Sequence, residues 1–132
     1  MARVPPGDGL TDAQRARLAH AVEAADAATG LSFLVRVGAL EGGRPQAEAL
    51  LAAQGTDSPR TVLVAVDPVA RTLEIVTGSA ASAALDDRTC ALASLTMTTS
   101  FAAGDLVGGL CRGVQILSDH GHHAVRRHLD TL

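Results

Sequence analysis

The clearest hydrophobic pattern along the chain lies in residues 61–78, which have the sequence TVLVAVDPVARTLEIVTG. Residues 61–66 carry apolar side chains at both alternating sets of positions, a pattern typical of a strand covered on two faces. Residues 72–77 include polar side chains among the apolar ones, which suits a strand nearer the edge of a sheet. The residues between them include Asp67 and Pro68 and favour a tight turn, so this stretch predicts an antiparallel pair of strands.

Helical spacing and strand-like alternation predict the other elements around this pair. Thr11 begins a capping-box motif at a helix start, and Gly30 is a suitable C-terminal cap for the same helix. Asp86 or Asp87, and later Asp105, are expected to cap two further helices. The predicted elements, in order, are a helix over 12–28, a strand over 31–37, a short helix over 45–54, the strands 61–66 and 72–77, a helix from the Asp86-Asp87 cap to about residue 99, and a helix from Asp105 to Gly121.

This order, α-β-α-β-β-α-α, predicts an α/β fold. A strand, a helix and a second strand in succession require a parallel pair joined by a right-handed crossover. The third strand then returns antiparallel through the tight turn. We therefore expect a three-layer α/β/α sandwich on a small mixed sheet of three to four strands, with residues 78–85 as a loop or a weak extra strand.

Two glycines lie on the apolar stripe of the last predicted helix. Gly109 and Gly113 share this stripe with Leu106, Leu110 and other apolar residues at helical spacing. A glycine inside a helix costs about 1 kcal/mol relative to alanine. Their position predicts that the backbone of this helix closely approaches the sheet or another helix.

Length and composition fit one folded domain. The chain has 132 residues, of which 47% are hydrophobic and 19% are charged, so it can bury a substantial core. We expect residues 1–9 to be a flexible lead, residues 10–120 to form the α/β domain and residues 121–132 to be a C-terminal tail.

Charge and hydropathy exclude some classes of partner. A net charge of -3 and only two aromatic residues, Phe33 and Phe101, argue against nucleic-acid binding, which needs a basic face or stacking platforms. No apolar run approaches the length of about twenty residues that a transmembrane helix needs. The N-terminus also lacks the apolar stretch of a secretory signal, so a cytoplasmic location is the default expectation.

The predicted strand directions sort the acidic residues to two edges of the sheet. Asp86 and Asp87, with Asp57, are expected at one edge, whereas Asp67 and Asp105, with Glu41, are expected at the other. Clustered carboxylates on irregular backbone are suitable ligands for Ca²⁺. The structural alternative is that these aspartates cap helices or form turns.

The histidines and the short motifs add no further catalytic centre. His120, His122, His123 and His128 suit a transition metal, although their position after Gly121 favours a solvated tail. The sequence has no GxSxG, P-loop, GxGxxG or HExxH motif, which argues against the corresponding hydrolase, nucleotide-binding and zinc-protease functions.

Several short motifs, in their order and spacing, resemble the TPM domain of thylakoid-lumen photosystem repair proteins and of many bacterial proteins. They are Leu10-Thr11 before a helix ending in Thr29-Gly30-Leu31, the strand 74–78 ending in glycine, Leu85-Asp86-Asp87 in place of Leu-x-Asp, and residues 101–105 with Gly109 and Gly113 in place of F-x-x-G-D…G. The resemblance covers roughly residues 10–117 and is nearest to an actinobacterial branch of uncharacterised proteins.

The TPM resemblance implies an α/β/α sandwich and two activities reported among relatives, acid phosphatase activity and calcium binding. The matched site positions are Gly78, in a ligand-binding loop, Asp87 and Asp105. Ala80 stands where the family often has a second glycine. We also expect neither the signal peptide nor the downstream membrane or glycine-rich tail that many relatives have.

Two functions from different classes follow. The first is a non-catalytic binding or adaptor module with an unidentified protein partner, responsive to a divalent cation such as calcium, because the acidic residues lack an accompanying nucleophile or base. The alternative is a cation-assisted acid phosphatase that uses Asp87 and its neighbours as metal ligands or acid–base groups. Calcium is the one cofactor expected, with Asp86 and Asp87 as the first candidate site and Asp67 and Asp105 as the second.

Overall fold

A computed structural model describes residues 9–130 of the chain, and the side chains of residues 9–122. The flexible lead predicted for residues 1–9 lies almost entirely outside the described residues. The elements are α1 (Asp12–Thr29), β1 (Ser32–Val37), α2 (Gly43–Ala52), the 3-10 helix η1 (Gly55–Arg60), β2 (Thr61–Asp67), β3 (Thr72–Thr77), α3 (Ser79–Ala84), α4 (Asp87–Ala102) and α5 (Leu106–Asp130).

The three strands form one mixed sheet in the order β1-β2-β3. β1 runs parallel to β2, with Ser32 opposite Thr61 and Val37 opposite Val66. β3 runs antiparallel to β2, from Thr72 opposite Asp67 back to Thr77 opposite Val62. The predicted chain directions are therefore confirmed, because α2 supplies the crossover between the parallel strands and a tight turn joins the antiparallel ones.

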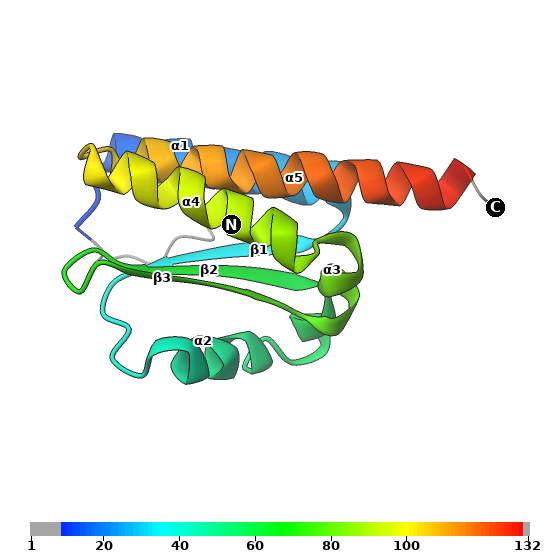
Figure 1. Cartoon of the computed structure of the whole chain (residues 1–132), viewed down its shortest axis with the longest axis horizontal. Helices are drawn as coiled ribbons and strands as arrows, with labels where there is room; N and C mark the ends of the chain where they lie inside the picture. Colours follow the sequence, from blue (N-terminus) through cyan, green and yellow to red (C-terminus); the bar gives the residue numbers. More distant parts are fainter. Residues whose placement is uncertain (1–8, 131–132) are drawn as a thin grey trace.

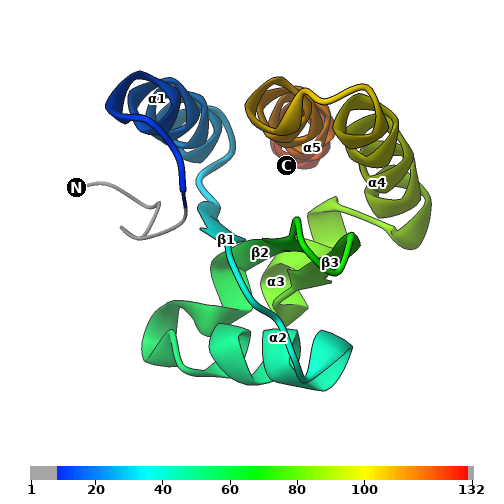
Figure 2. The ribbon, with the colours of Figure 1, turned by 90° about the vertical axis from the view of Figure 1, so that its left-hand side faces the viewer.

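Helices cover both faces of this sheet, which confirms the three-layer sandwich. α1, α5 and α4 lie on one face and α2 lies on the other (Figures 1 and 2). The larger core, on the three-helix side, contains Leu18, Val22, Phe33, Val35, Val62, Val64, Ile75, Met97, Leu110, Val114 and Leu117. The smaller core, on the α2 side, contains Leu40, Ala47, Leu63, Ala65 and Val76.

Among the strands of residues 9–130, β2 alone has all of its residues buried. Alternate side chains of β2 enter the two cores, which is why both of its faces are apolar in sequence. β3 has exposed or half-buried residues at both ends, as its polar positions indicate. The hydrophobic pattern of residues 61–78 therefore correctly predicts the position of these two strands and how far each is buried.

Two predictions about the second half of the chain are wrong. Residues 79–84 form the short helix α3, and not a loop or a fourth strand. Helix α5 continues through Gly121 to Asp130, so Gly121 does not end it. Gly121 is buried, and a Cβ built there would lie 3.1 Å from Cγ2 of Thr29 at the end of α1. The helix continues because packing against α1 covers a position that local propensity marks as a terminus.

The glycines of α5 lie against α4, which confirms the predicted close approach. A Cβ on Gly109 would lie 2.7 Å from Cβ of Ser100 and 2.9 Å from Cε1 of Phe101. A Cβ on Gly113 would overlap the buried side chain of Met97. Small residues at these two positions therefore set the distance between the two helices.

None of the helices in the described part of the chain is both long enough and apolar enough to cross a membrane.

We expect Gly109→Ala to destabilise the domain although alanine favours helices. Overpacking against α4 typically costs 1–3 kcal/mol, whereas the helix preference of alanine recovers only about 1 kcal/mol. The free energy of unfolding, measured by urea denaturation, should fall by up to about 2 kcal/mol. Gly121→Ala is the matched control in the same helix and should cost less, because its nearest neighbour is at 3.1 Å and can shift. An equal or larger loss for Gly121→Ala would contradict this account.

Candidate functional site

Two pockets lie at opposite ends of β3, and each contains sequence-predicted site residues. The first, here called the hairpin pocket, has a volume of about 460 Å³ and lies between the β2–β3 turn and the α4–α5 turn. The second, called the Gly78 pocket, has a volume of about 410 Å³ and is more open to solvent. The hairpin pocket is lined by Val66, Asp67, Pro68, Arg71, Thr72, Leu73, Thr98, Phe101, Ala102, Gly104 and Leu106.

Asp67 lines the hairpin pocket, and its carboxylate accepts three backbone hydrogen bonds. Its Oδ1 accepts from the amides of Val69 and Ala70, each at 3.1 Å, and its Oδ2 accepts from the amide of Leu40, also at 3.1 Å. These amides, that of Ala70 foremost, hold the pKa of Asp67 below its usual value although burial opposes them. Asp67 is therefore an ionised structural group that ties the β2–β3 turn to the segment after β1.

Asp105 lies at the same end of the sheet and is also engaged. Its Oδ1 accepts from the amide of Gly108 at 2.9 Å, which confirms that it caps α5. Its Oδ2 accepts from Arg112 at 3.1 Å, and this guanidinium, followed by the Gly108 amide, lowers the pKa of Asp105. Sequence analysis correctly placed Asp67 and Asp105 at one edge, but each carboxylate is occupied by its own local partners.

Arg71 is the unusual residue of the hairpin pocket. Its φ of 59° makes it the sole non-glycine residue with a positive φ in the described part of the chain. This conformation favours glycine or asparagine, because a Cβ there crowds the backbone. Within residues 9–122 the Arg71 side chain has no hydrogen-bond or ion-pair partner. The pocket therefore combines mostly apolar walls with one solvent-exposed guanidinium that has no protein partner within the described residues.

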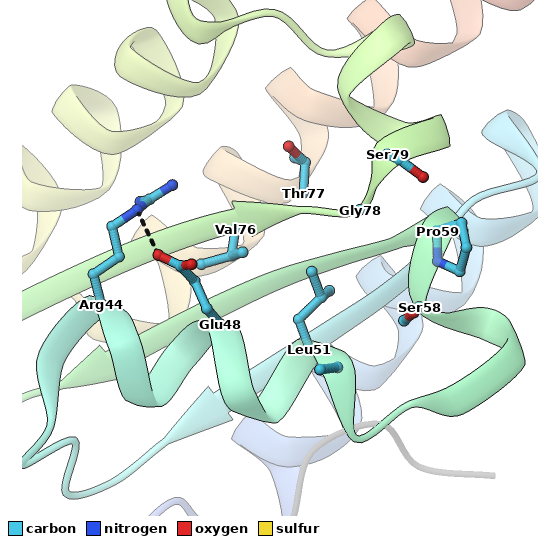
Figure 3. A pocket seen from close by; sticks show the side chains of 10 residues that line it. Arg44, Glu48, Leu51, Ser58, Pro59, Val76, Thr77, Gly78 and Ser79 are labelled. Atoms are coloured by element: carbon cyan, nitrogen blue, oxygen red, sulfur yellow. Dashed lines mark ion pairs between the residues drawn. The ribbon is translucent and has the colours of Figure 1, made fainter.

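The Gly78 pocket also contains an arginine, but this one is neutralised. Arg44 of α2 forms an ion pair with Glu48 at 3.5 Å (Figure 3). It forms a second ion pair with Glu74 of β3 at 3.2 Å. It also donates to the backbone oxygen of Ile75 at 3.3 Å. A Cβ at Gly78 would overlap the carbonyl oxygen of Ser58, so close backbone packing requires glycine at this position.

α4 begins beside α3, at the end of the sheet opposite the β2–β3 turn, as the topology predicts (Figure 1). Asp86 is the N-cap of α4 and Asp87 is its first residue. Oδ1 of Asp86 caps α4 by accepting from the amide of Thr89 at 2.9 Å and from its hydroxyl at 2.8 Å, and these bonds lower the pKa of Asp86. Asp87 is exposed in the first turn of α4.

The predicted metal sites have no ready-made ligand cluster in the described residues. Nowhere in this part of the chain do three or more histidine, cysteine or acidic residues come together as a metal ion would need. Nδ1 of His120 lies 2.9 Å from the Ile116 oxygen, and Nδ1 of His122 lies 3.0 Å from the Ala28 oxygen. The side chains of His123 and His128 lie outside the described residues. Calcium binding at Asp67, Asp105, Asp86 and Asp87 stays a prediction.

A family model described as a domain of unknown function, DUF5130, matches residues 5–118. The chain belongs to the DUF5130 family. The match includes both pockets, because all residues that line them lie between positions 44 and 106. No curated protein gives a significant match to this DUF5130 domain.

Three solved NMR structures share the fold of this DUF5130 domain. The N-terminal domain of a P. gingivalis protein has a TM-score of 0.77 at 17% identity, covering 90% of this chain and 81% of that one. The BA42 protein of Bizionia argentinensis has a TM-score of 0.76 at 16% identity, covering 91% and 86%. The N-terminal domain of the cg2496 protein of Corynebacterium glutamicum has a TM-score of 0.73 at 13% identity, covering 88% and 76%. At these identities the likeness establishes the fold alone.

Sequence analysis did not identify Arg71 as a site residue, because it lies in a turn with no recognised motif. The signal that was available is its residue type. Turns of this kind favour glycine or asparagine before the second strand, and an arginine there is out of place. The side of the hairpin on which its side chain lies follows only from the packing of α4 and α5.

We expect Arg71→Gly to stabilise the domain. The left-handed conformation costs an ordinary residue about 1–2 kcal/mol, which glycine does not incur. Glycine also loses more chain entropy on folding, and this cancels about half of the stabilisation. The free energy of unfolding, measured by urea denaturation, should rise by up to about 1 kcal/mol. Arg71→Ala is the control, because it removes the side chain and keeps the strained backbone, so it should give no gain. Equal stability of the two variants would contradict backbone strain at this position.

The lowered pKa of Asp67 predicts a dependence of stability on acidity. A depressed folded-state pKa contributes stability above the unfolded pKa of about 4, and this contribution is lost as the pH falls through the folded value. Asp67→Asn should therefore be less stable than the wild type at pH 7, with a smaller difference at pH 3. Urea midpoints at both pH values measure this, with the exposed Glu41→Gln as control. A difference that does not shrink in acid would show that the charge of Asp67 is not what stabilises the turn.

Proposed function

We propose that this DUF5130 domain is a non-catalytic binding module whose ligand site is the hairpin pocket. One observation carries the proposal: an apolar pocket of about 460 Å³ contains a cationic side chain without a partner in the described residues. Ligand pockets typically have this character, with mostly apolar walls and a few polar groups that fix orientation. The volume is within the usual range for small-molecule sites.

The place of the pocket in the fold supports the same proposal. β1 and β2 are parallel, and the pocket lies at the carboxyl end of β2, where the chain turns at Asp67 and Pro68. Ligands of open α/β sheets bind preferentially outside the carboxyl ends of the strands. The walls come from three separate segments, β2–β3, the end of α4 and the start of α5, so the pocket exists only in the folded domain.

The engagement of the acids favours binding over catalysis. A general base must present a free carboxylate within hydrogen-bond reach of the reacting proton. Asp67 already accepts three backbone hydrogen bonds, and Asp105 is shared between an amide and Arg112. A cation-assisted acid phosphatase remains the alternative. It and the calcium response come from the resemblance of residues 10–117 to TPM domains. At Asp67 and Asp105 they require that a metal displace some of these hydrogen bonds, whereas Asp87 is exposed and its carboxylate has no partner within the described residues.

The proposal can be tested by a bulky substitution on α4 that fills the pocket. Ala102 is exposed and lines the pocket, so Ala102→Phe should fill the space without disturbing the core. Ala91→Phe is the matched control, because Ala91 is exposed on the same helix and does not line the pocket. We expect octanoate, octyl phosphate or octan-1-ol to shift amide NMR resonances of residues 66–73 and 98–106. These shifts should persist in Ala91→Phe and disappear in Ala102→Phe.

Two results would contradict the proposal. One is a set of NMR shifts for all three probes that lies elsewhere or survives Ala102→Phe. The other is release of inorganic phosphate from octyl phosphate, with or without Ca²⁺, which would favour the phosphatase. Loss of that release in Asp87→Ala or Asp105→Ala would then place the chemistry at one of the two predicted edges.

A further inference from the structure

The charges around the hairpin pocket leave one group available for a ligand. Asp67 is ionised and bound to three amides, and Asp105 is paired with Arg112. Of the charged residues that line the pocket, Arg71 is the one whose side chain has no partner within the described residues. Its five N–H donors match a carboxylate in a bidentate geometry.

The register of the sheet supplies a second donor beside Arg71. The amide of Gly78 donates to the oxygen of Thr61, and backbone groups along an antiparallel strand alternate in direction. Residues 72, 74 and 76 therefore bond to β2, whereas Leu73, Ile75 and Thr77 present their backbone groups to the open edge of the sheet. Arg44 donates to the Ile75 oxygen on this open side, which agrees with the alternation. The amide of Leu73, a residue that lines the pocket, thus faces away from β2.

The residues that line the pocket are apolar apart from Asp67, Arg71, Thr72 and Thr98. Val66 and Leu73 come from the hairpin, and Phe101 and Leu106 come from the α4–α5 turn. A ligand that fills this pocket needs an apolar body, because these side chains offer no hydrogen bonds. The hydroxyl of Thr98 already donates to the oxygens of Ser94 and Leu95.

Charge selects between carboxylate and phosphate. The two charged residues that line the pocket, Arg71 and Asp67, have a formal sum of zero before a ligand binds. A carboxylate brings one negative charge, which the free guanidinium can pair. A phosphomonoester brings nearly two at neutral pH, and the second has no cation in the lining to meet it. Ionised Asp67 repels both anions, but it repels the more highly charged phosphate more strongly.

We propose that the hairpin pocket binds a small organic monocarboxylate with an apolar body, and that Arg71 and the Leu73 amide hold its carboxylate. This inference rests on the proposed function, since it names the ligand class of the same pocket. It also accounts for arginine at a left-handed position, where the backbone favours glycine. Arginine at this position strains the backbone and so lowers the stability of the domain. Its role in binding the carboxylate explains why arginine is nevertheless present there.

Three probes with eight-carbon chains, of which octanoate has the shortest apolar part because its eighth carbon is the carboxyl carbon, separate the contribution of the anionic group. We expect octanoate, titrated below its micelle concentration and followed by amide NMR shifts, to bind more tightly than octyl phosphate and octan-1-ol. Arg71→Gln should weaken octanoate binding about fivefold to tenfold, the effect of a charge-assisted hydrogen bond reduced by solvent exposure. It should leave octan-1-ol unchanged, and Arg71→Lys should keep part of the preference for octanoate. Arg88→Gln, exposed at the far end of α4 and outside the pocket, is the charge-matched control and should change nothing.

The outcomes separate this inference from the proposed function. Equal binding of octanoate and octan-1-ol, or an unchanged octanoate preference in Arg71→Gln, would overturn the carboxylate inference and leave the pocket as a ligand site. Tightest binding of octyl phosphate would overturn it in favour of a phosphorylated ligand. If no probe shifts the resonances of the pocket, the monocarboxylate inference and the proposed ligand site both fail.

Discussion

Burial of β2 on both faces is the constraint on which the rest of this structure depends. A strand that is apolar on both faces from Val62 to Val66 needs an apolar layer above and below it, and the chain provides α1, α4 and α5 on one side and α2 on the other. The parallel crossover from β1 through α2 and the antiparallel return to β3 follow from that need. The same arrangement brings the end of β2 to the surface at Asp67, where the apolar run stops.

Asp67 converts the end of that strand into a fixed turn. One carboxylate satisfies two amides of the turn and one amide of the segment that follows β1, so three stretches of backbone are joined at a single ionised group. The rigid turn is what holds Arg71 in a left-handed conformation that it would not otherwise favour. The acid that the sequence marks as a candidate metal ligand therefore joins the turn to the segment after β1, and the arginine beside it is the lining group available to a ligand.

The contact between α4 and α5 completes the pocket from the other side. Gly109 and Gly113 allow the two helices to approach closely, with Ser100, Phe101 and Met97 filling the space that a side chain would take. This fixes the turn between the helices, and with it the positions of Phe101 and Leu106 over the hairpin. Substitutions in this helix pair can thus alter the pocket without touching a residue that lines it.

Local patterns in the amino-acid chain were enough for much of the fold. The apolar run of residues 61–66, the capping groups Asp86 and Asp105, and the glycines of the last helix predicted the strand order, the helix starts and the close helix approach, because each depends on neighbouring residues. Long-range packing settled the rest. Gly121 lies inside a helix because α1 covers it, and residues 79–84 become helical although their small side chains show no clear period. Arg71 acquires a pocket only when segments thirty residues apart meet around it, a contact that no local sequence pattern encodes.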